Sequence, residues 1–489
     1  MTTLRRRRLL QSALAAAVLG ASGLASRPAR AGGVLQAALS GGSAADSWDP
    51  RRPRGVFMVA ASQGAVFDTL TEVAADGTLK GELATGWEAS PDARRWTVTL
   101  RDGVSFHNGR RLTAEDVLAS LALHRDPASP AYALVSGIEE MRAISPRDLR
   151  FTLRSGNADF PYLLADPHLV ILPADDMAEA MARGIGTGLY RVERFDPGRR
   201  FIGTRVTEHW KDGSAGWFDR VDFLALADPD ARLRALAEGR VDAADALPPA
   251  ALATLDSDPR LRLIRQTGNL QYGFAADPGL DSADLRLALK HAMDRPRLVA
   301  EVLGGYGQPG RDTPIGPANP YFSGATPPAH DPDRARFHLR RAGLEGIPLP
   351  VSAAETAFPG AAQAADLLTE TLPLRAASPG DPALRALISP GRATEDWSLS
   401  MAPAACAPCD GSRARFDTLL QTARAEFDSA RRAELYAELQ MMGASSGGLI
   451  LPMAADHLQG LSRRLATPAT QGALWQMDDA RMAERWWIA

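Results

Sequence analysis

The chain has 489 residues, and at roughly 150 residues per domain this length predicts about three domains. Hydrophobic residues make up 45% and charged residues 23%, which is typical of a globular protein and excludes a chain disordered by excess charge. The formal net charge is only −3, which argues against a nucleic-acid-binding protein with a strongly basic face. Two cysteines exclude a disulfide scaffold and a four-thiolate metal site.

The first 31 residues are typical of an export signal. A basic stretch at 5–8 precedes a short apolar run over 13–25, and Ala29-Arg30-Ala31 has the A-x-A form of a cleavage site. The apolar run is too short to span a membrane. Arg6-Arg7 followed by Leu9-Leu10 resembles a twin-arginine signal, and an ordinary secretory signal rich in arginine is the alternative. Cleavage would remove six arginines and no acidic residue, which shifts the formal charge from −3 to about −9.

The segments that follow predict mixed α and β structure. Residues 96–100 alternate between apolar and polar, as in a half-buried strand, and a turn at Asp102-Gly103 reverses the chain. Thr113 and Asp116 resemble a capping box, which predicts that a helix begins there. Residues 206–226 predict strands that are broken by Lys211-Asp212-Gly213.

The second half of the chain predicts further helices. One begins at Ser282, and the next begins at Asp294 and ends near Gly304-Gly305. Residues 413–425 and 429–442 predict a pair of helices with many exposed charges. Because strands and helices do not alternate strictly, the pattern argues against a simple doubly wound sheet.

Most catalytic motifs are absent from the sequence. It has no nucleotide-binding glycine loop, no HExxH and no GxSxG, and its eight histidines form no ligand-spaced cluster. We therefore expect no enzymatic activity, no cofactor and no metal. Cys406 and Cys409 form a C-x-x-C in a loop rich in proline and alanine. A small local disulfide is the expected state, with free thiols and redox or metal chemistry as alternatives.

Several sequence blocks match one family in order and spacing. The most specific are GELATGWEASPD at 81–92, WTVTLRDGVSFHNG at 96–109 and LTAEDV at 112–117. They resemble the family 5 solute-binding proteins of bacterial ABC importers, the peptide/nickel (oligopeptide- and dipeptide-binding) group. The resemblance covers about 45–485 of the chain. Weaker blocks continue it at 68–72, 186–190 (with Leu189 in place of the usual proline), 235–242, 285–295, 305–309 and 415–420.

The resemblance implies an α/β, two-lobed periplasmic-binding-protein fold with a hinge and an extra subdomain in the first lobe. The implied function is to deliver a peptide or a similar small solute to an ABC-importer permease in the inner membrane, by closing on it like a clam. We expect a periplasmic monomer that binds no nucleic acid. Mapped onto this chain, the parts are a signal peptide at 1–31, a first lobe at 32–69, 181–259 and 456–489, its extra subdomain at 70–180, and a second lobe at 260–455.

Two other functions are alternatives. One is an exported enzyme that depends on a cofactor or on redox chemistry, because twin-arginine export often carries such proteins. The other is a degenerate paralogue that acts as a sensor or receptor. The crossover motif is reduced to Gln271–Ala275, and the segment between Glu370 and Thr394 is short for the family. These departures suggest a small or unusual ligand.

The resemblance also implies candidate ligand-binding residues. Peptide-binding members hold the ligand's ammonium with an aspartate in a block resembling G-W-x-x-D, and Ser389–Trp397 is the best candidate stretch here. In one register Arg392 replaces that aspartate and favours a carboxylate or phosphate. In another register Glu395 or Asp396 takes the role, and surface positions for all three are the alternative.

The family layout further places Trp48, Phe67, Tyr272 and Phe274 at the pocket wall. Ordinary core packing is as strong an expectation for Trp48 and Tyr272 as stacking on a ligand.

Overall fold

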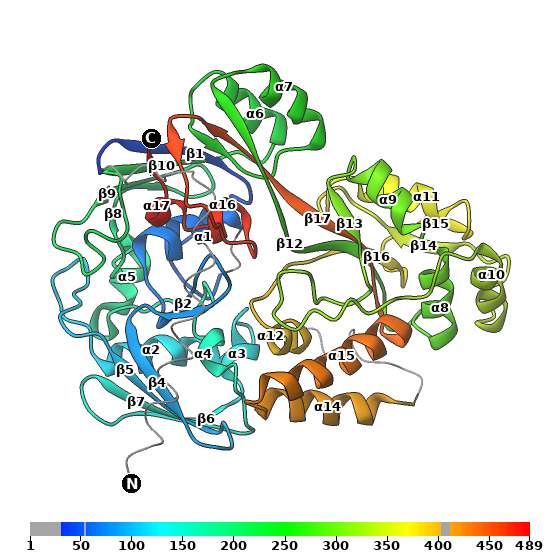
Figure 1. Ribbon diagram of the computed structural model, residues 1–489, viewed down its shortest axis with the longest axis horizontal. Coiled ribbons are helices and arrows are strands. Elements are labelled where there is room, and N and C mark those ends of the chain that lie inside the picture. Colours follow the sequence, from blue (N-terminus) through cyan, green and yellow to red (C-terminus); the bar gives the residue numbers. More distant parts are fainter. Residues whose placement is uncertain (1–30, 53–54, 402–410) are drawn as a thin grey trace, which may run out of the picture.

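The computed structural model describes residues 31–52, 55–401 and 411–489. It has two lobes, which are linked by the long strands β12 (Leu261–Ala276) and β17 (Leu449–Ser462) (Figure 1). These two strands belong to one eleven-stranded sheet that continues from one lobe into the other. The two-lobed α/β architecture expected from the sequence is therefore present.

The first lobe is built on β1 (Val34–Leu39), which pairs in parallel with β10 (Arg220–Ala225) and with β11 (Ala243–Ala244). Two antiparallel strands, β9 (Arg200–Arg205) and β8 (Tyr190–Asp196), complete its edge. Most of β1 and β10 is buried, as expected for strands covered on both faces. The helices of this lobe are α1 (Val56–Ala61) with the π-helical turn η1 (Ser62–Val66), α5 (Met177–Arg183), α6 (Pro229–Ala237), α7 (Leu252–Ser257), α16 (Gln476–Asp479) and α17 (Met482–Arg485).

A separate four-stranded antiparallel sheet lies below this lobe in Figure 1. Its strand order is β4 (Ala84–Ala89), β5 (Arg95–Leu100), β7 (Asp148–Leu153) and β6 (Ile138–Ala143). The predicted strand at 96–100 is therefore confirmed. The predicted capping box is also present, and it starts α2 (Ala114–Ala122). Shorter elements around this sheet are β2 (Thr71–Val73), β3 (Leu79–Gly81), α3 (Tyr132–Val135) and α4 (Phe160–Leu163).

The hinge strands β12 and β17 pair antiparallel over most of their length, from Leu261 opposite Ser462 to Ala275 opposite Leu449. The end of β17 also pairs with β11 of the first lobe, whereas the second half of β12 pairs with β16 (Leu384–Ser389) of the second lobe. The ladder is interrupted between Thr267 and Gln271. Such an interruption bends the strands locally and redirects the side chains within it.

The second lobe completes the sheet with β14 (Leu349–Ser352), β15 (Leu374–Ala376) and β13 (Gly307–Pro309). The predicted caps are present: the hydroxyl of Ser282 accepts a hydrogen bond from the Leu285 amide, and Asp294 caps the following helix. The helices are α8 (Ala283–Ala292), α9 (Arg295–Val302), α10 (Pro332–Arg341), α11 (Ala361–Leu368), α12 (Glu395–Met401), α14 (Arg413–Ala425) and α15 (Ser429–Ser446).

The strands predicted over 206–226 are correct only for β10. Residues between β9 and β10 turn instead, because Lys211 is drawn into the interior, where its Nζ lies 2.9 Å from Asp68, 2.7 Å from Glu82 and 2.8 Å from Glu484. This ion cluster overrides the local strand pattern. Among the described helices, none is both long and apolar enough to cross a membrane.

Candidate functional site

A cavity of about 50 Å³ lies between the two lobes. The first lobe contributes Gln63, the turn at 165–167 and the C-terminal segment 474–481. The second lobe contributes the loop after β16 and the first turn of α12, between Gly391 and Trp397. The cavity thus brings together four segments that are far apart in the sequence.

Arg392 faces this cavity from the second lobe. Its Nη1 donates a 3.3 Å hydrogen bond to the Gly391 carbonyl, whereas its buried Nε finds no acceptor among the described residues. Burial lowers the pKa of the guanidinium from its ordinary value, and the charge of Asp166 opposes this only in part. A buried cation with an unused donor is costly, and an anion would remove that cost.

The loop that carries Arg392 is fixed by two buried asparagines. Asn269, which lies in the interruption of β12, donates a 2.7 Å hydrogen bond to the Asn319 side chain, and Asn319 donates one of 2.9 Å to the Arg392 carbonyl. Gly391 packs so closely here that an added Cβ would lie 2.6 Å from the Asn269 Cβ. The hinge strand therefore positions Arg392 through Asn319 and through the contact between Asn269 and Gly391.

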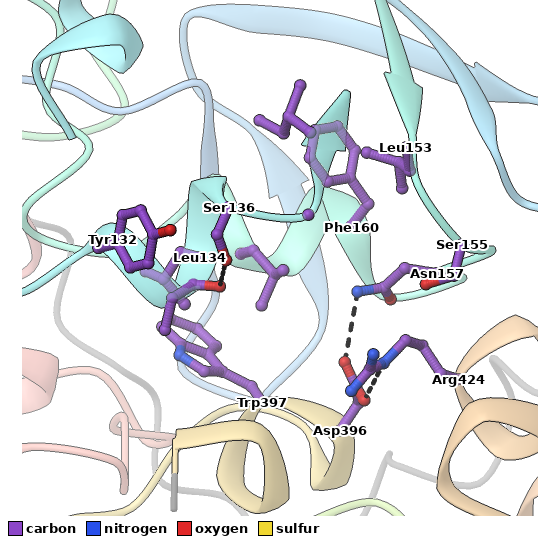
Figure 2. Close-up of a pocket in the computed structure, with 14 residues that line it drawn as sticks. Tyr132, Leu134, Ser136, Leu153, Ser155, Asn157, Phe160, Asp396, Trp397 and Arg424 are labelled. Carbon is purple, nitrogen blue, oxygen red and sulfur yellow. Dashed lines mark hydrogen bonds and ion pairs between the residues drawn. The ribbon is translucent and has the colours of Figure 1, made fainter. Parts of the chain in front are cut away.

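Trp397 forms a second wall of the cavity. Its indole ring is 5% exposed, and the Arg392 guanidinium lies 5.8 Å from the ring centre. The indole Nε1 is buried and, like Arg392 Nε, has no acceptor among the described residues. In Figure 2 this nitrogen lies on the side of the ring that is turned away from Asn157 and Asp396.

Two carboxylates face the cavity from the first lobe. Burial raises the pKa of Asp479 to about 6, because the nearby Arg485 and the amides of Leu474 and Trp475 only partly compensate for it. Burial also acts to raise the pKa of Asp166, but hydrogen bonds from His168 and the charge of Arg392 outweigh it and hold that pKa below its usual value. The cavity therefore holds both acidic and basic groups.

The backbone around Asp479 has an unusual conformation. Met477, Asp478, Asp479 and Ala480 all have positive φ angles, between 57° and 61°. None is glycine, so each residue is in a conformation that costs free energy, typically about 1–3 kcal/mol. Strain of this kind is common at ligand-binding sites.

Arg481 also lines the cavity, but its charge is already neutralised. Its Nη1 lies 2.8 Å from Glu82 and 2.7 Å from Glu484, both of which also contact Lys211. Asp68, Glu82 and Glu484 are the one group of potential metal ligands found in the described part of the chain. The Lys211 ammonium lies among them, so this arrangement is an ion cluster.

Glu395 and Asp396 do not line the cavity at Arg392. The Glu395 Oε1 accepts a 2.5 Å hydrogen bond from the Tyr321 amide, and burial raises its pKa to about 7. Asp396 lies 2.7 Å from the Arg424 Nε and accepts a 3.3 Å hydrogen bond from Asn157 of the first lobe. The contacts of both residues therefore stabilise the start of α12, and Asp396 also links the two lobes (Figure 2).

The four aromatic candidates lie in the cores of the lobes. Trp48 packs on Phe67 and on other rings of the first lobe, at centroid distances of 4.5 to 6.0 Å. Tyr272 stacks on Phe358 at 4.9 Å, and Phe274 is fully buried. None of them lines the cavity at Arg392. Cys406 and Cys409 lie outside the described residues, so their disulfide stays a prediction.

Two residues that the sequence predicted for the site, Arg392 and Trp397, line this cavity, whereas the residues of the opposing wall were not predicted. Asp166, Trp475, Asp479 and Arg481 belong to no motif, and their positions depend on how the C-terminal segment folds back. The only local signal was the pair of adjacent acidic residues Asp478-Asp479 in the C-terminal segment.

Comparisons with known proteins agree with this architecture. The family model for bacterial extracellular solute-binding proteins, family 5 Middle, matches residues 78–372, more than half of the chain. The glutathione-binding protein GsiB of Escherichia coli O6:K15:H31 is 27% identical over 279 residues, which are 54% of this chain and 53% of that protein. The chain thus matches about half the length of that relative. Di/tripeptide-binding protein 2 of Pseudomonas aeruginosa is 28% identical over 342 residues, 62% of each chain.

Solved structures share the fold at lower sequence identity. The binding protein AgaA of A. tumefaciens R10, solved with agropinic acid, has a TM-score of 0.80 and 21% identity, and the match covers 94% of this chain and 99% of AgaA. DppA of Helicobacter pylori, solved with the peptide STSA, also has a TM-score of 0.80 and 21% identity, with 93% and 98% covered. The matching family model and the shared two-lobed fold lead to one conclusion: this chain belongs to the bacterial extracellular solute-binding proteins, family 5.

Proposed function

We propose that this protein binds a short peptide, or a similar small zwitterion, between its lobes and delivers it to an ABC-importer permease. The observation that carries the proposal is the cavity between the lobes, which is lined by Arg392 and Trp397. Each has a buried donor, Arg392 Nε and Trp397 Nε1, without an acceptor among the described residues. A carboxylate fits both donors, because charge-assisted hydrogen bonds to arginine are strong and directional.

The acidic groups of the opposite wall suit the other end of such a ligand. Asp479 and Asp166 belong to the first lobe, so an ammonium near them and a carboxylate near Arg392 would place the solute across the gap. A ligand that contacts both lobes binds the closed form better than the open one and therefore shifts the population toward it. No covalent step is needed for this function.

The ligands of related proteins support this class of ligand for the chain. Glutathione and di- or tripeptides are named for the sequence relatives, and a tetrapeptide and agropinic acid for the structural ones. All are small polar solutes. We extend the same class to this chain because its cavity has donors and carboxylates on opposite walls.

The remaining features of the proposal follow the sequence. We propose export through the signal at 1–31 by the twin-arginine route, a periplasmic location and a monomeric state. The proposed division is a first lobe at 32–69, 181–259 and 456–489, an extra subdomain at 70–180 and a second lobe at 260–455. The redox alternative depends on Cys406 and Cys409, and no described residue favours it.

Calorimetric titration of the purified protein with alanyl-alanine and with its C-terminal amide tests the proposal. The free acid should bind, and Arg392→Ala should weaken it tenfold or more, since truncating one partner of a buried charge pair costs about 2–5 kcal/mol. The same variant should leave the unliganded protein as stable as before, because it removes an uncompensated buried charge. Arg336→Ala, which breaks an exposed ion pair in α10, is the matched control. Equal affinity of Arg392→Ala and the unaltered protein for the free acid would contradict the proposal.

A further inference from the structure

A separate cavity, of about 330 Å³, lies within the second lobe. It is formed by Met293, Arg295 and Pro296 at the start of α9, by 308–311 along β13 and by 326–330 of the loop before α10. The elements α9 and β13 lie next to each other in Figure 1. None of these residues lines the cavity between the lobes, so the two cavities are distinct. The volume falls within the range of small-molecule pockets.

The ionisable side chains on the wall of this second-lobe cavity are basic. Arg295, Arg311 and His330 line it, and no aspartate or glutamate is among the described residues that do so. Asp294 and Asp331, which flank these segments in the sequence, instead accept hydrogen bonds from the first turns of α9 and α10. The wall therefore offers positive charge without a carboxylate beside it.

Arg295 belongs to a buried cluster of two cations and one carboxylate. Its Nη2 lies 2.7 Å from Asp312 Oδ2, and the Lys290 Nζ lies 3.3 Å from the same oxygen. In the described part of the chain, neither cation has another carboxylate partner. The nearby Arg286 is paired with Asp281, so that pair adds no net charge. The cluster therefore carries one excess positive charge.

The protein compensates this excess charge only in part. Lys290 and Arg295 otherwise donate to backbone carbonyls, and the Arg295 Nε is buried without an acceptor among the described residues. Burial lowers the pKa of Lys290 from its ordinary value, and the charge of Asp312 opposes this only in part. An uncompensated buried charge is costly, and an anion beside Arg295 would offset that cost.

Arg311 provides a second guanidinium on the same wall. Its Nη1 donates hydrogen bonds of 2.8 and 3.1 Å to the carbonyls of Gly324 and Ala325, and the guanidinium lies 5.4 Å from the centre of the Phe322 ring. These contacts fix the planar group but use only one of its three nitrogen atoms. The other two are left for a ligand, and guanidinium groups match the geometry of oxyanions.

We propose that the second-lobe cavity binds a small oxyanion of the phosphate class, which Arg295 and Arg311 hold and which neutralises the excess charge of the cluster with Lys290. An oxyanion supplies several acceptors at once, so it can pair with both guanidinium groups. The bound anion would stabilise the second lobe. The inference is independent of the proposed function, because no residue of the cavity between the lobes takes part.

Calorimetric titration with inorganic phosphate, at an ionic strength held constant with sodium chloride, tests the inference. Phosphate should bind the unaltered protein, and Arg311→Ala should weaken it about tenfold or more, because hydrogen bonds to a charged group are lost. Arg375→Ala is the matched control: Arg375 also donates from Nη1 to a backbone carbonyl, at 3.1 Å, but does not line the cavity. Absence of phosphate binding, or equal affinity in Arg311→Ala, would overturn the inference.

A parallel titration of Arg392→Ala separates this site from the one between the lobes, since Arg392 also attracts anions. Arg392→Ala should keep its affinity for phosphate and lose affinity for alanyl-alanine, and Arg311→Ala should do the reverse. If Arg392→Ala alone loses phosphate, the anion binds between the lobes and the second-lobe site is wrong, while the proposed function stands. If neither variant changes the binding of alanyl-alanine, the proposed function fails and the second-lobe site is unaffected.

Lys290→Met tests the role of the buried charge. Lys290 does not line the cavity, so a site made by shape alone would bind phosphate in this variant as before. Loss of the excess charge should instead lower the affinity for phosphate by roughly tenfold. The variant leaves Arg295 and Asp312 as a balanced pair and should fold, which unfolding curves without phosphate check. Lys80→Met, at an exposed position, is its control. Unchanged phosphate affinity in folded Lys290→Met would contradict the neutralisation.

Glycerol 3-phosphate distinguishes the two sources of such a group. Tighter binding of glycerol 3-phosphate than of inorganic phosphate, lost in Arg311→Ala, would identify a phosphate ester as the ligand of the second-lobe cavity. Equal or weaker binding would identify the free ion.

Discussion

Arg392 and Asp479 show how single residues give the cavity its chemistry. Each is a buried ionisable group whose compensation within the protein is incomplete, so burial lowers the pKa of the arginine and raises that of the aspartate. Groups of this kind bind ligands well, because a ligand group of opposite charge offsets the free-energy cost of burying the ionised side chain. They belong to opposite lobes, so a zwitterion that satisfies both also holds the lobes together.

The raised pKa of Asp479 predicts a pH-dependent affinity. With a pKa of about 6, the carboxyl is largely ionised at pH 7.5 and largely protonated at pH 5. Only the ionised form attracts an ammonium, so the affinity for alanyl-alanine should fall as the pH falls through 6, by at most about tenfold per pH unit. Calorimetry across this range measures the effect.

Two controls isolate the contribution of Asp479. N-acetylation of the dipeptide removes the ammonium and should flatten the pH dependence, and so should Asp479→Asn. A pH dependence that survives in Asp479→Asn would assign it to another group, of which Glu395, with a pKa raised to about 7, is the nearest in range.

At the scale of elements, the ion cluster around Lys211 ties several parts of the first lobe together. Lys211 lies between β9 and β10, Asp68 follows η1, Glu82 follows β3, and Glu484 belongs to α17. The chain has only three lysines, and two of them, Lys211 and Lys290, are buried in ion pairs. The compact ammonium of Lys211 contacts all three carboxylates, whereas the planar guanidinium of Arg481 contacts two of them, Glu82 and Glu484.

Removal of this ammonium should destabilise the protein. Lys211→Met leaves three buried carboxylates with less compensation, and breaking a buried ion pair in this way costs about 3–5 kcal/mol. Chemical denaturation should show this loss. Lys80→Met, at an exposed position of β3, is the matched control and should change the free energy of unfolding by less than about 0.5 kcal/mol. Similar unfolding midpoints for both variants would show that the cluster contributes little.

At the scale of the whole molecule, the lobes meet at the hinge formed by β12 and β17. They also meet at a second place, beside the cavity that Asn157, Asp396 and Trp397 line. At the second place, Arg432 of α15 lies 2.6 Å from Asp159, and the Ala158 amide donates a 2.7 Å hydrogen bond to the Arg424 carbonyl. These contacts join the lobes without any ligand, so they stabilise the arrangement of the lobes that this structure has.

This bridge predicts that its loss opens the unliganded protein. In Asp159→Asn, Arg432 loses its charge partner in the closed form but gains water in the open form, so the closed population should fall about tenfold or more. Small-angle X-ray scattering should show a larger radius of gyration without ligand and a return to the compact value with saturating ligand. Asp222→Asn breaks the Arg200–Asp222 pair, 2.6 Å long, within the first lobe and should leave the radius unchanged. An unchanged radius of gyration in Asp159→Asn would mean that the hinge alone determines how far the lobes close without ligand.

The sequence by itself determined the local elements and the family. The capping box at Thr113, the helix starts at Ser282 and Asp294 and the strand at 96–100 depend on neighbouring residues, so their patterns were readable without the fold. Tertiary structure decided the rest. It turned the segment around Lys211 into an ion-paired loop, placed Trp48 and Tyr272 in the cores, and set Asp166 and Asp479 opposite Arg392. The cavity is assembled from four distant segments, and no local pattern specifies which of their side chains meet across two lobes.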